Sequence, residues 1–309
     1  MLDHARHVLG ALVAGFVLLI AASSAEAEPT IAVEPAAVRA VWSVVTFTTS
    51  ALSVECPVTL EGSFHSTTFT ATSGLDVGSV TRASAAEGSC TGGRVRMLSE
   101  TLPWRIKYES STGTLPEISG IKLNVVGFAL RGEASGLTCL YQSTESRPAR
   151  ATLEVRPQTI AVTGLRLDET AGIPLASREG FCVFAGEGRA AGTASVREAE
   201  GGGQANVAVV NDDAPLRFAP GSTITLPAGK TFEDVRIEAT SNRTLGVLAI
   251  RSDRTGGDFH VGRGCDNQAI GVNVFCETTV SYTGGIANRG AYVEVPVNSL
   301  VRWIYIHRP

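Results

Sequence analysis

Apolar and polar residues alternate along most of this chain, and this alternation restricts its fold more than any other feature. Every second residue is apolar in the runs 52–60, 104–108 and 121–125. A period of two places the apolar side chains of a strand on one face, which packs inward, and the polar ones on the other. Clusters of glycine and serine, typical of turns, separate the runs. The sequence therefore predicts an all-β protein of antiparallel strands, arranged as a sandwich or a barrel.

The chain length and one break in the alternation predict two β domains. A chain of 309 residues corresponds to about two domains. Residues 197–220 include three consecutive glycines among charged residues, a composition typical of a linker or of a mobile hairpin tip. We therefore expect a sandwich or barrel domain at residues 45–196, a linker at 197–220 and a second domain at 221–309. The second domain carries about seven short strand-like runs, the number in an immunoglobulin-like (Ig-like) sandwich.

The first residues have the pattern of a secretion signal. Arg6 precedes an apolar run at residues 8–22, and Ala25-Glu26-Ala27 fits a signal-peptide cleavage site. The run is shorter than the ~20 residues of a membrane-spanning helix, which favours a cleaved signal over an uncleaved anchor. We therefore expect residues 1–27 to be a signal peptide, with no membrane span after its removal. The mature protein is then expected to be secreted, extracellular or associated with the cell surface.

Six cysteines in an exported chain predict disulfide bonds, because exported proteins fold in an oxidising compartment. No C-x-x-C motif occurs, so neither a zinc nor a redox site is expected. Many pairings are open to six cysteines, and proximity in the sequence favours three of them. The three expected bridges are Cys56–Cys90, Cys139–Cys182 and Cys265–Cys276.

A series of short motifs characterises the C-terminal domain. In chain order they are T-L-P-A-G at 225–229, V-R-I at 235–237, S-N at 241–242, Phe259 before Cys265, Cys276 opening T-T-V-S-Y at 278–282, G-G at 284–285 and the strand 292–295. By these motifs residues 222–298 resemble the Ig-like domain of abnormal-spindle and hydin (ASH) type proteins, in its bacterial secreted form. Thr283 stands where that family usually has proline after the aromatic residue. The resemblance implies a binding or scaffold module without catalytic residues.

The first domain also resembles known proteins. Cys56, Cys90 and the motifs L-P-W at 102–104, G-T-L-P at 113–116 and C-L-Y at 139–141 are similar to those of uncharacterised secreted proteins of high-GC Gram-positive bacteria. This resemblance implies no activity.

The residues that catalysis or metal binding would need do not form a recognisable pattern. No G-x-S-x-G motif occurs, and the histidines at 65, 260 and 307 fit surface, turn or terminal positions. Asp212 and Asp213 lie in the most oxygen-rich turn, which we interpret as an ordinary Asx turn. The alternative is a weak calcium site of the kind found in extracellular modules. We therefore expect no catalytic residue, no metal site and no cofactor. The net charge of −4 and the lack of a dense basic run argue against a nucleic-acid partner.

Three aromatic residues are candidates for a binding surface: Trp104, Trp303 and Tyr305. Exposed aromatic rings stack on sugars, but burial in the core is the more usual role of such side chains. Residues 301–306 are apolar on both faces, which predicts that this strand is buried or forms an interface.

These observations together favour a secreted, non-catalytic β protein with a structural, adhesive or interaction role. Its partner would be an unknown protein or a cell-surface carbohydrate. Two alternatives stay open. One is an exported hydrolase whose carboxylates come from scattered loops, and the other is a carbohydrate- or cell-wall-binding module.

Overall fold

The computed structural model describes residues 28–309, apart from 51–52, 135–136, 158, 180–185, 211–215, 252–257, 273, 286–288 and 299. The expected signal peptide, residues 1–27, lies outside this part. Strands make up nearly all of the regular structure, and the described part adds two single-turn 3-10 helices, η1 (Glu87–Ser89) and η2 (Ser99–Thr101). The prediction of an all-β fold is confirmed.

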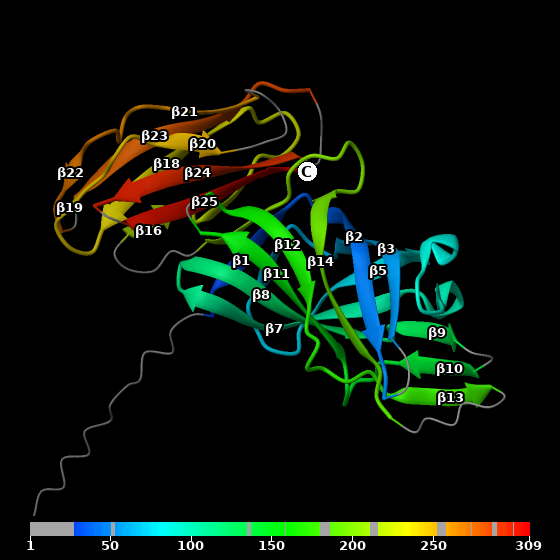
Figure 1. The fold of residues 1–309 in the computed structure, drawn as a ribbon. Helices are drawn as coiled ribbons and strands as arrows, with labels where there is room; N and C mark the ends of the chain where they lie inside the picture. Colours follow the sequence, from blue (N-terminus) through cyan, green and yellow to red (C-terminus); the bar gives the residue numbers. More distant parts are fainter. Residues whose placement is uncertain are drawn as a thin grey trace, which may run out of the picture.

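Eight strands of the first domain close into an antiparallel barrel (Figure 1). Each strand of the set pairs with the one that follows it in the chain, and β14 pairs with β2, which closes the ring. A closed ring leaves no unpaired strand edge among its members. Of the two architectures expected for this domain, the chain adopts the barrel. The barrel strands are β2 (Ala37–Thr48), β3 (Ser53–Phe64), β5 (Asp76–Ala85), β7 (Trp104–Thr114), β8 (Glu117–Val126), β11 (Ala149–Arg156), β12 (Ala161–Leu167) and β14 (Arg189–Glu198).

The alternation of the sequence decides which side of each strand faces the barrel interior. On β3, Val54, Cys56 and Val58 are buried, whereas Ser53 and Glu55 are exposed. Strand β11 repeats the pattern, with every second residue buried. These inward side chains belong to one hydrophobic core.

A four-stranded antiparallel sheet packs against the barrel end at which β2 finishes and β3 begins. The rings of Phe47 on β2 and Tyr141 on β10 lie edge to face with centroids 5.0 Å apart, which joins the sheet to the barrel core. Figure 1 shows β9, β10 and β13 side by side at this end. In spatial order the strands are β13 (Leu175–Glu179), β10 (Leu137–Gln142), β9 (Ala129–Ala134) and β6 (Arg94–Met97).

Part of the expected linker is a buried strand. Residues 206–210 form β15 (Asn206–Val210), all buried, which pairs with β1 (Thr30–Glu34) and with the start of β12. Strand β4 (Thr68–Thr70) lies on the other side of β1. The linker prediction is therefore wrong for this segment. Gly201–Gly203 instead belong to a turn that reverses the chain, and the Glu198 N–H donates to the Gly203 carbonyl across it at 2.8 Å. Strands β1 and β2 also start the first domain before residue 45.

Two four-stranded sheets enclose the core of the second domain. Strands β17 and β25 pair in parallel, which departs from the expected all-antiparallel arrangement. A small two-stranded sheet of β19 (Arg243–Thr244) and β22 (Ala269–Ile270) completes the domain. The first sheet holds β16 (Leu216–Ala219), β18 (Phe232–Ala239), β23 (Phe275–Tyr282) and β21 (Phe259–Val261), and the second holds β17 (Thr223–Thr225), β25 (Leu300–Arg308), β24 (Arg289–Val297) and β20 (Ala249–Arg251).

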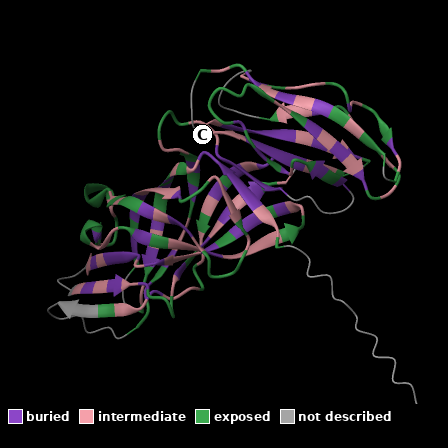
Figure 2. Ribbon diagram, turned by 180° about the vertical axis from the view of Figure 1, so that it is seen from behind, coloured by how far each residue is buried: buried purple, intermediate pink, exposed green. Residues whose placement is uncertain are grey.

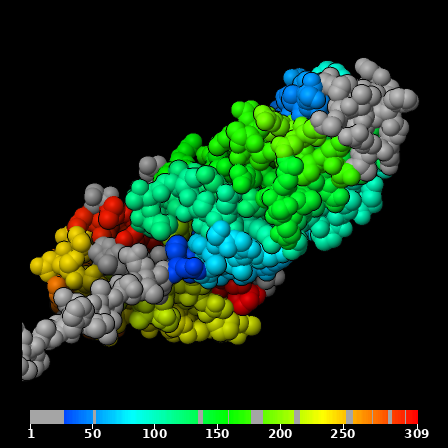
Figure 3. All heavy atoms as spheres, turned by 90° about the horizontal axis from the view of Figure 1, so that it is seen from below, coloured from blue at the N-terminus to red at the C-terminus, as the bar shows by residue number. Residues whose placement is uncertain are grey.

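The two domains share an apolar interface between β1 and β15 on one side and β24 and β25 on the other. Ala32 and Ala208 belong to one buried cluster with Tyr292, Trp303 and Tyr305. Figure 2 colours the strands that meet there largely as buried. In the space-filling view of Figure 3, the second domain, yellow to red, adjoins the blue-to-green first domain. The interface uses the face of β25 that turns away from the second domain's own core.

Candidate functional site

The barrel interior holds an apolar cavity of about 80 Å³. A smaller cavity of about 20 Å³ lies beside it, toward the four-stranded sheet, and shares part of its lining. Trp42 and Phe128 line both. The side chains of an eight-stranded barrel usually fill its interior or leave room for one small ligand. Here they leave part of the interior unfilled. Further apolar lining comes from Val38, Leu60, Val80, Ile106, Leu123, Val125, Leu165, Leu167 and Ile173.

The cavity exists because small residues occupy inward positions of the wall. Ala40 on β2, Ala149 and Ala151 on β11 and Ala190 on β14 are buried and line it. A larger apolar side chain at any of these positions would project into the same space. The size of the cavity therefore depends on the sequence at a few wall positions, within a backbone that the strand pairing holds.

Charged residues that border the cavity turn their polar groups away from it. Arg150 lies between two inward-facing alanines, so the strand alternation directs it outward, where its Nε is 3.9 Å from a Glu109 carboxylate oxygen. Asp168 follows β12, and the N–H and hydroxyl of Thr170 donate to its Oδ1 at 2.9 and 2.6 Å. These hydrogen bonds hold the pKa of Asp168 below its usual range. Hydrocarbon therefore dominates the interior surface.

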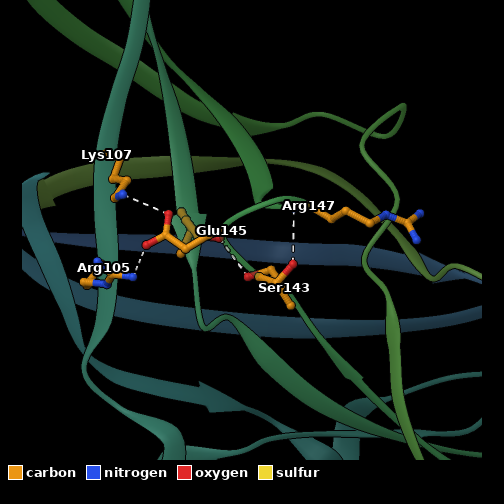
Figure 4. A network of polar contacts seen from close by, with 7 residues as sticks. Arg105, Lys107, Ser143, Glu145 and Arg147 are labelled. Atoms are coloured by element: carbon orange, nitrogen blue, oxygen red, sulfur yellow. Dashed lines mark hydrogen bonds and ion pairs between the residues drawn. The ribbon is translucent and has the colours of Figure 1, made fainter. Parts of the chain in front are cut away.

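A polar network fixes the loop 143–148 beside the cavity (Figure 4). The Glu145 carboxylate lies between Arg105 and Lys107 of β7, with Lys107 Nζ at 2.8 Å from Oε2. The hydrogen bond from Lys107 is the main cause that lowers the pKa of Glu145. The buried Ser143 donates its N–H to the Phe128 carbonyl at 2.8 Å. The network thus attaches the loop both to the outside of the barrel and to a residue of the cavity wall.

Two of the three expected disulfides are confirmed. Cys56 is bonded to Cys90 and ties β3 to the segment before β6, and Cys265 is bonded to Cys276 within the second domain. The expected Cys139–Cys182 bridge involves Cys182, which lies outside the described residues. The acidic turn at Asp212 and Asp213, interpreted above as an ordinary Asx turn, lies outside them as well.

The three aromatic residues considered for a binding surface do not form one, because all three are buried. Trp104 is 0% exposed, Trp303 3% and Tyr305 0%. Trp104 packs on Phe128 with ring centroids 5.0 Å apart, and its Nε1–H donates to Thr101 Oγ1 at 2.8 Å. These contacts place Trp104 behind the cavity wall as a support.

Trp303 and Tyr305 lie in the interface between the domains. The Tyr305 hydroxyl donates to the buried Glu34 carboxylate at 3.0 Å, and Trp303 meets the Tyr292 ring edge to face. Burial first, and then the neighbouring Tyr305 and Glu34, raise the pKa of Tyr292 well above its usual value. The expectation of a buried or interfacial strand at 301–306 agrees with this arrangement.

The described residues contain no cluster of side chains of the kind that binds a metal ion. No group of three or more histidine, cysteine or acidic side chains within them could hold a metal ion. His65 and His260 are exposed. No helix in the described part is long and apolar enough to cross a membrane.

Reasoning from the sequence missed the cavity. The available signal was the series of alanines on the inward side of strands that otherwise carry large apolar residues, as at Ala149 and Ala151 beside Leu153 and Val155. Such alanines become informative only when the strands around them are known to close into a ring.

Comparison with known proteins does not assign the chain to a family. No family model matches it, and no curated protein matches it. Among solved structures, a Vibrio cholerae VesB protease matches with a TM-score of 0.25 and 11% sequence identity, over 86% of this chain and 95% of that chain. A TM-score of this size supports neither a shared fold nor a shared activity.

Proposed function

We propose that the protein is an exported, non-catalytic binding protein whose barrel takes up a small apolar molecule. The observation that carries this proposal is the hydrocarbon-lined cavity of about 80 Å³ inside the closed barrel. Apolar cavities do not favour water, and a cavity of about 150 Å³ accommodates benzene. A ligand of roughly three to five non-hydrogen atoms fits a cavity of this smaller size, or the end of a longer chain does.

Two further features support the export and interaction parts of the proposal. The disulfides Cys56–Cys90 and Cys265–Cys276 are typical of proteins that fold outside the reducing cytoplasm. The motifs at residues 222–298 resemble the ASH-type Ig-like domain, which suggests a module that docks on a protein or a cell-surface carbohydrate. In this proposal the barrel holds the ligand and the second domain makes the contact with the partner.

Filling the cavity tests the proposal directly. We expect 2-methyl-1-butene, which has five carbon atoms, to bind in about the millimolar range, because so small a ligand has little contact area. Methyl NMR signals of wall residues such as Leu123 and Val125 should shift on titration. In Ala151→Leu the added side chain occupies the cavity, so these ligand-dependent shifts should disappear. Filling a cavity commonly raises stability by about 0.5–2 kcal/mol, so the variant should remain folded.

Ala37→Leu is the matched control, because Ala37 is exposed at the start of β2 and its replacement leaves the cavity open. This variant should bind like the unaltered protein. Undiminished binding by Ala151→Leu, or shifts confined to residues outside the barrel interior, would contradict the proposal.

A second candidate function rests on an open groove of about 490 Å³ on the outer surface of β3 and β5. Thr59, Thr81 and Ser99 supply hydroxyl groups there, a lining that favours a polar ligand such as a carbohydrate. The Glu61 carboxylate in this groove is paired with Arg82, at 3.2 Å, and with Arg39, at 2.7 Å, which favours binding over hydrolysis. Retention of the protein on insoluble peptidoglycan or polysaccharide would support this candidate.

A further inference from the structure

Four charged side chains form a row across the outer surface of the barrel. Strands β14, β2, β3 and β5 are neighbours in the barrel wall, in this order (Figure 1). Arg197 on β14 lies directly opposite Arg39 on β2, and Arg39 lies opposite Glu61 on β3. Glu61 in turn lies opposite Arg82 on β5. Neighbouring strands are about 4.8 Å apart, so the row extends over roughly 14 Å.

The charges in the row do not cancel. Glu61 Oε1 is 2.7 Å from Arg39 Nε, and its Oε2 is 3.2 Å from Arg82 Nη1, so one carboxylate serves two guanidinium groups. Arg197 Nη1 donates at 3.1 Å to the neutral Oε1 of Gln204. Like charges directly opposite each other destabilise a sheet, and Arg197 and Arg39 are such a pair. The row therefore carries more positive charge than the strand pairing needs.

A β-bulge joins the row to the open groove on β3 and β5. Glu61 is paired with Arg82 and the next residue of β3 with Val80, so Thr81 is an extra residue in β5. Thr81 and Arg82 are consecutive, yet both are exposed and both line the groove. Bulges re-aim side chains and are frequent beside functional sites. The Arg82 side chain is 80% exposed, so a ligand in the groove reaches its guanidinium group directly.

We propose that the groove and the row bind an acidic polysaccharide built of uronic acids, which are sugars that carry a carboxylate. This inference rests on the second candidate function, carbohydrate binding in the groove, and specifies the charge of its ligand. The sugar hydroxyl groups contact the hydroxyl side chains of the groove, and the carboxylates accept from Arg82, Arg39 and Arg197. A guanidinium group suits this role because it donates two parallel hydrogen bonds to one carboxylate.

A nucleic acid fits these features less well than a uronic acid chain. Its dense phosphate charge calls for a long basic surface, whereas the row is short and the whole chain has a net charge of −4. The hydroxyl-rich groove beside the row also matches a sugar.

The test compares two ligands with the same sugar backbone in the full chain. Tetragalacturonate carries four carboxylates, and its methyl ester carries none. Titration followed by the backbone amide NMR signals of β3 and β5 measures both affinities. We expect the acid to bind roughly fivefold more tightly than the ester, or better, at low salt. This advantage should shrink as salt is added, because exposed charges are screened beyond about 8 Å at 0.15 M.

Single substitutions in the row change the affinity ratio of acid to ester. Arg197→Gln and Arg82→Gln should each lower the ratio by about two- to fivefold. Glu61→Gln should raise it by a similar factor, because it removes the carboxylate that competes with the ligand for Arg39 and Arg82. Arg156→Gln is the control, since this exposed arginine at the end of β11 lies outside the row, and it should leave the ratio unchanged. All four variants should stay folded, because exposed ion pairs contribute little to stability.

The possible results separate the inference from the functions proposed above. If acid and ester bind equally, the inference is overturned and carbohydrate binding in the groove stands. Equal effects of Arg156→Gln and Arg197→Gln would also overturn it, because they would show attraction to the protein's charge in general. Tighter binding of a single-stranded DNA of matched charge would assign the row to nucleic acid instead.

If neither sugar ligand binds, the inference fails. The second candidate function fails as well only if the protein is also not retained on insoluble peptidoglycan or polysaccharide. The cavity function depends on neither result, because 2-methyl-1-butene tests it inside the barrel.

Discussion

At the scale of single residues, small side chains decide what the barrel can do. Alanines at inward positions such as Ala149 and Ala151 leave the cavity open, and Gly192 lets Trp42 lie close to β14. The φ angle of Gly192 is +146°, a backbone conformation that other residues rarely adopt. The alternation of the sequence places the apolar residues inward, but residue volume decides whether the interior is filled.

Gly192→Ala should destabilise the protein by about 1–3 kcal/mol. The new Cβ would lie 2.8 Å from the Val44 carbonyl oxygen and 3.2 Å from Trp42 Cδ1, in addition to the unfavourable φ. Chemical unfolding followed by tryptophan fluorescence measures the loss. Gly229→Ala is the control, since its φ is +88° but nothing lies within 4 Å of the added Cβ, so it should lose less. Equal losses in the two variants would show that contact with Trp42 and Val44 is unimportant.

At the scale of elements, two disulfides tie strands to the segments between them. The Cys265–Cys276 bridge spans 11 residues of sequence and Cys56–Cys90 spans 34. The stretch around Cys265 and Cys276 also contains His260 and Asp266, which together could suggest a metal or thiol site. The structure instead bonds the two cysteines to each other, and Asp266 Oδ1 accepts from the Leu248 N–H at 2.9 Å.

Replacing both cysteines of a bridge with alanine should cost more for the longer loop. In the chain-entropy account the loss is about 3 kcal/mol for Cys265–Cys276 and about 4 kcal/mol for Cys56–Cys90, because a longer loop gains more freedom in the unfolded chain. Urea unfolding of the two double variants, with the oxidised protein as reference, measures both values. A larger loss for the shorter loop would contradict this account.

At the scale of the whole molecule, strand β25 unites the two domains. One face of the strand, with Ile304 and Ile306, fills the core of the second domain. The other face, with Trp303 and Tyr305, packs on β1 and β15 of the first domain. This double use explains why residues 301–306 are apolar on both sides. It also explains why these aromatic rings are unavailable as a surface for sugars.

Tyr305→Phe should weaken the docking of the domains by about 1.5–3 kcal/mol, because it leaves the buried Glu34 carboxylate without one of its donors. Differential scanning calorimetry should show a lower transition temperature, or two separated transitions if the domains come apart first. Glu34→Gln retains an acceptor for the tyrosine and should lose less. A change below about 0.5 kcal/mol in Tyr305→Phe would mean that the hydrogen bond does not contribute to docking.

The sequence by itself determined the features that depend on neighbouring residues. Strand alternation, as at Val54, Cys56 and Val58, is a local property with a period of two, so the β class and the inward faces could be predicted. The bridges Cys56–Cys90 and Cys265–Cys276 join cysteines close in sequence, and proximity was enough to pair them.

Only the tertiary structure decided the features that bring distant segments together. The pairing of β14 with β2 closes the barrel and joins two strands that most of the domain's sequence separates. No local pattern in either strand specifies that partner. The cavity exists only inside that closed ring, and the burial of Trp303 and Tyr305 depends on a second domain docking on β1 and β15. Periodicity defines which face of a strand is buried, whereas long-range packing defines what that face is buried against.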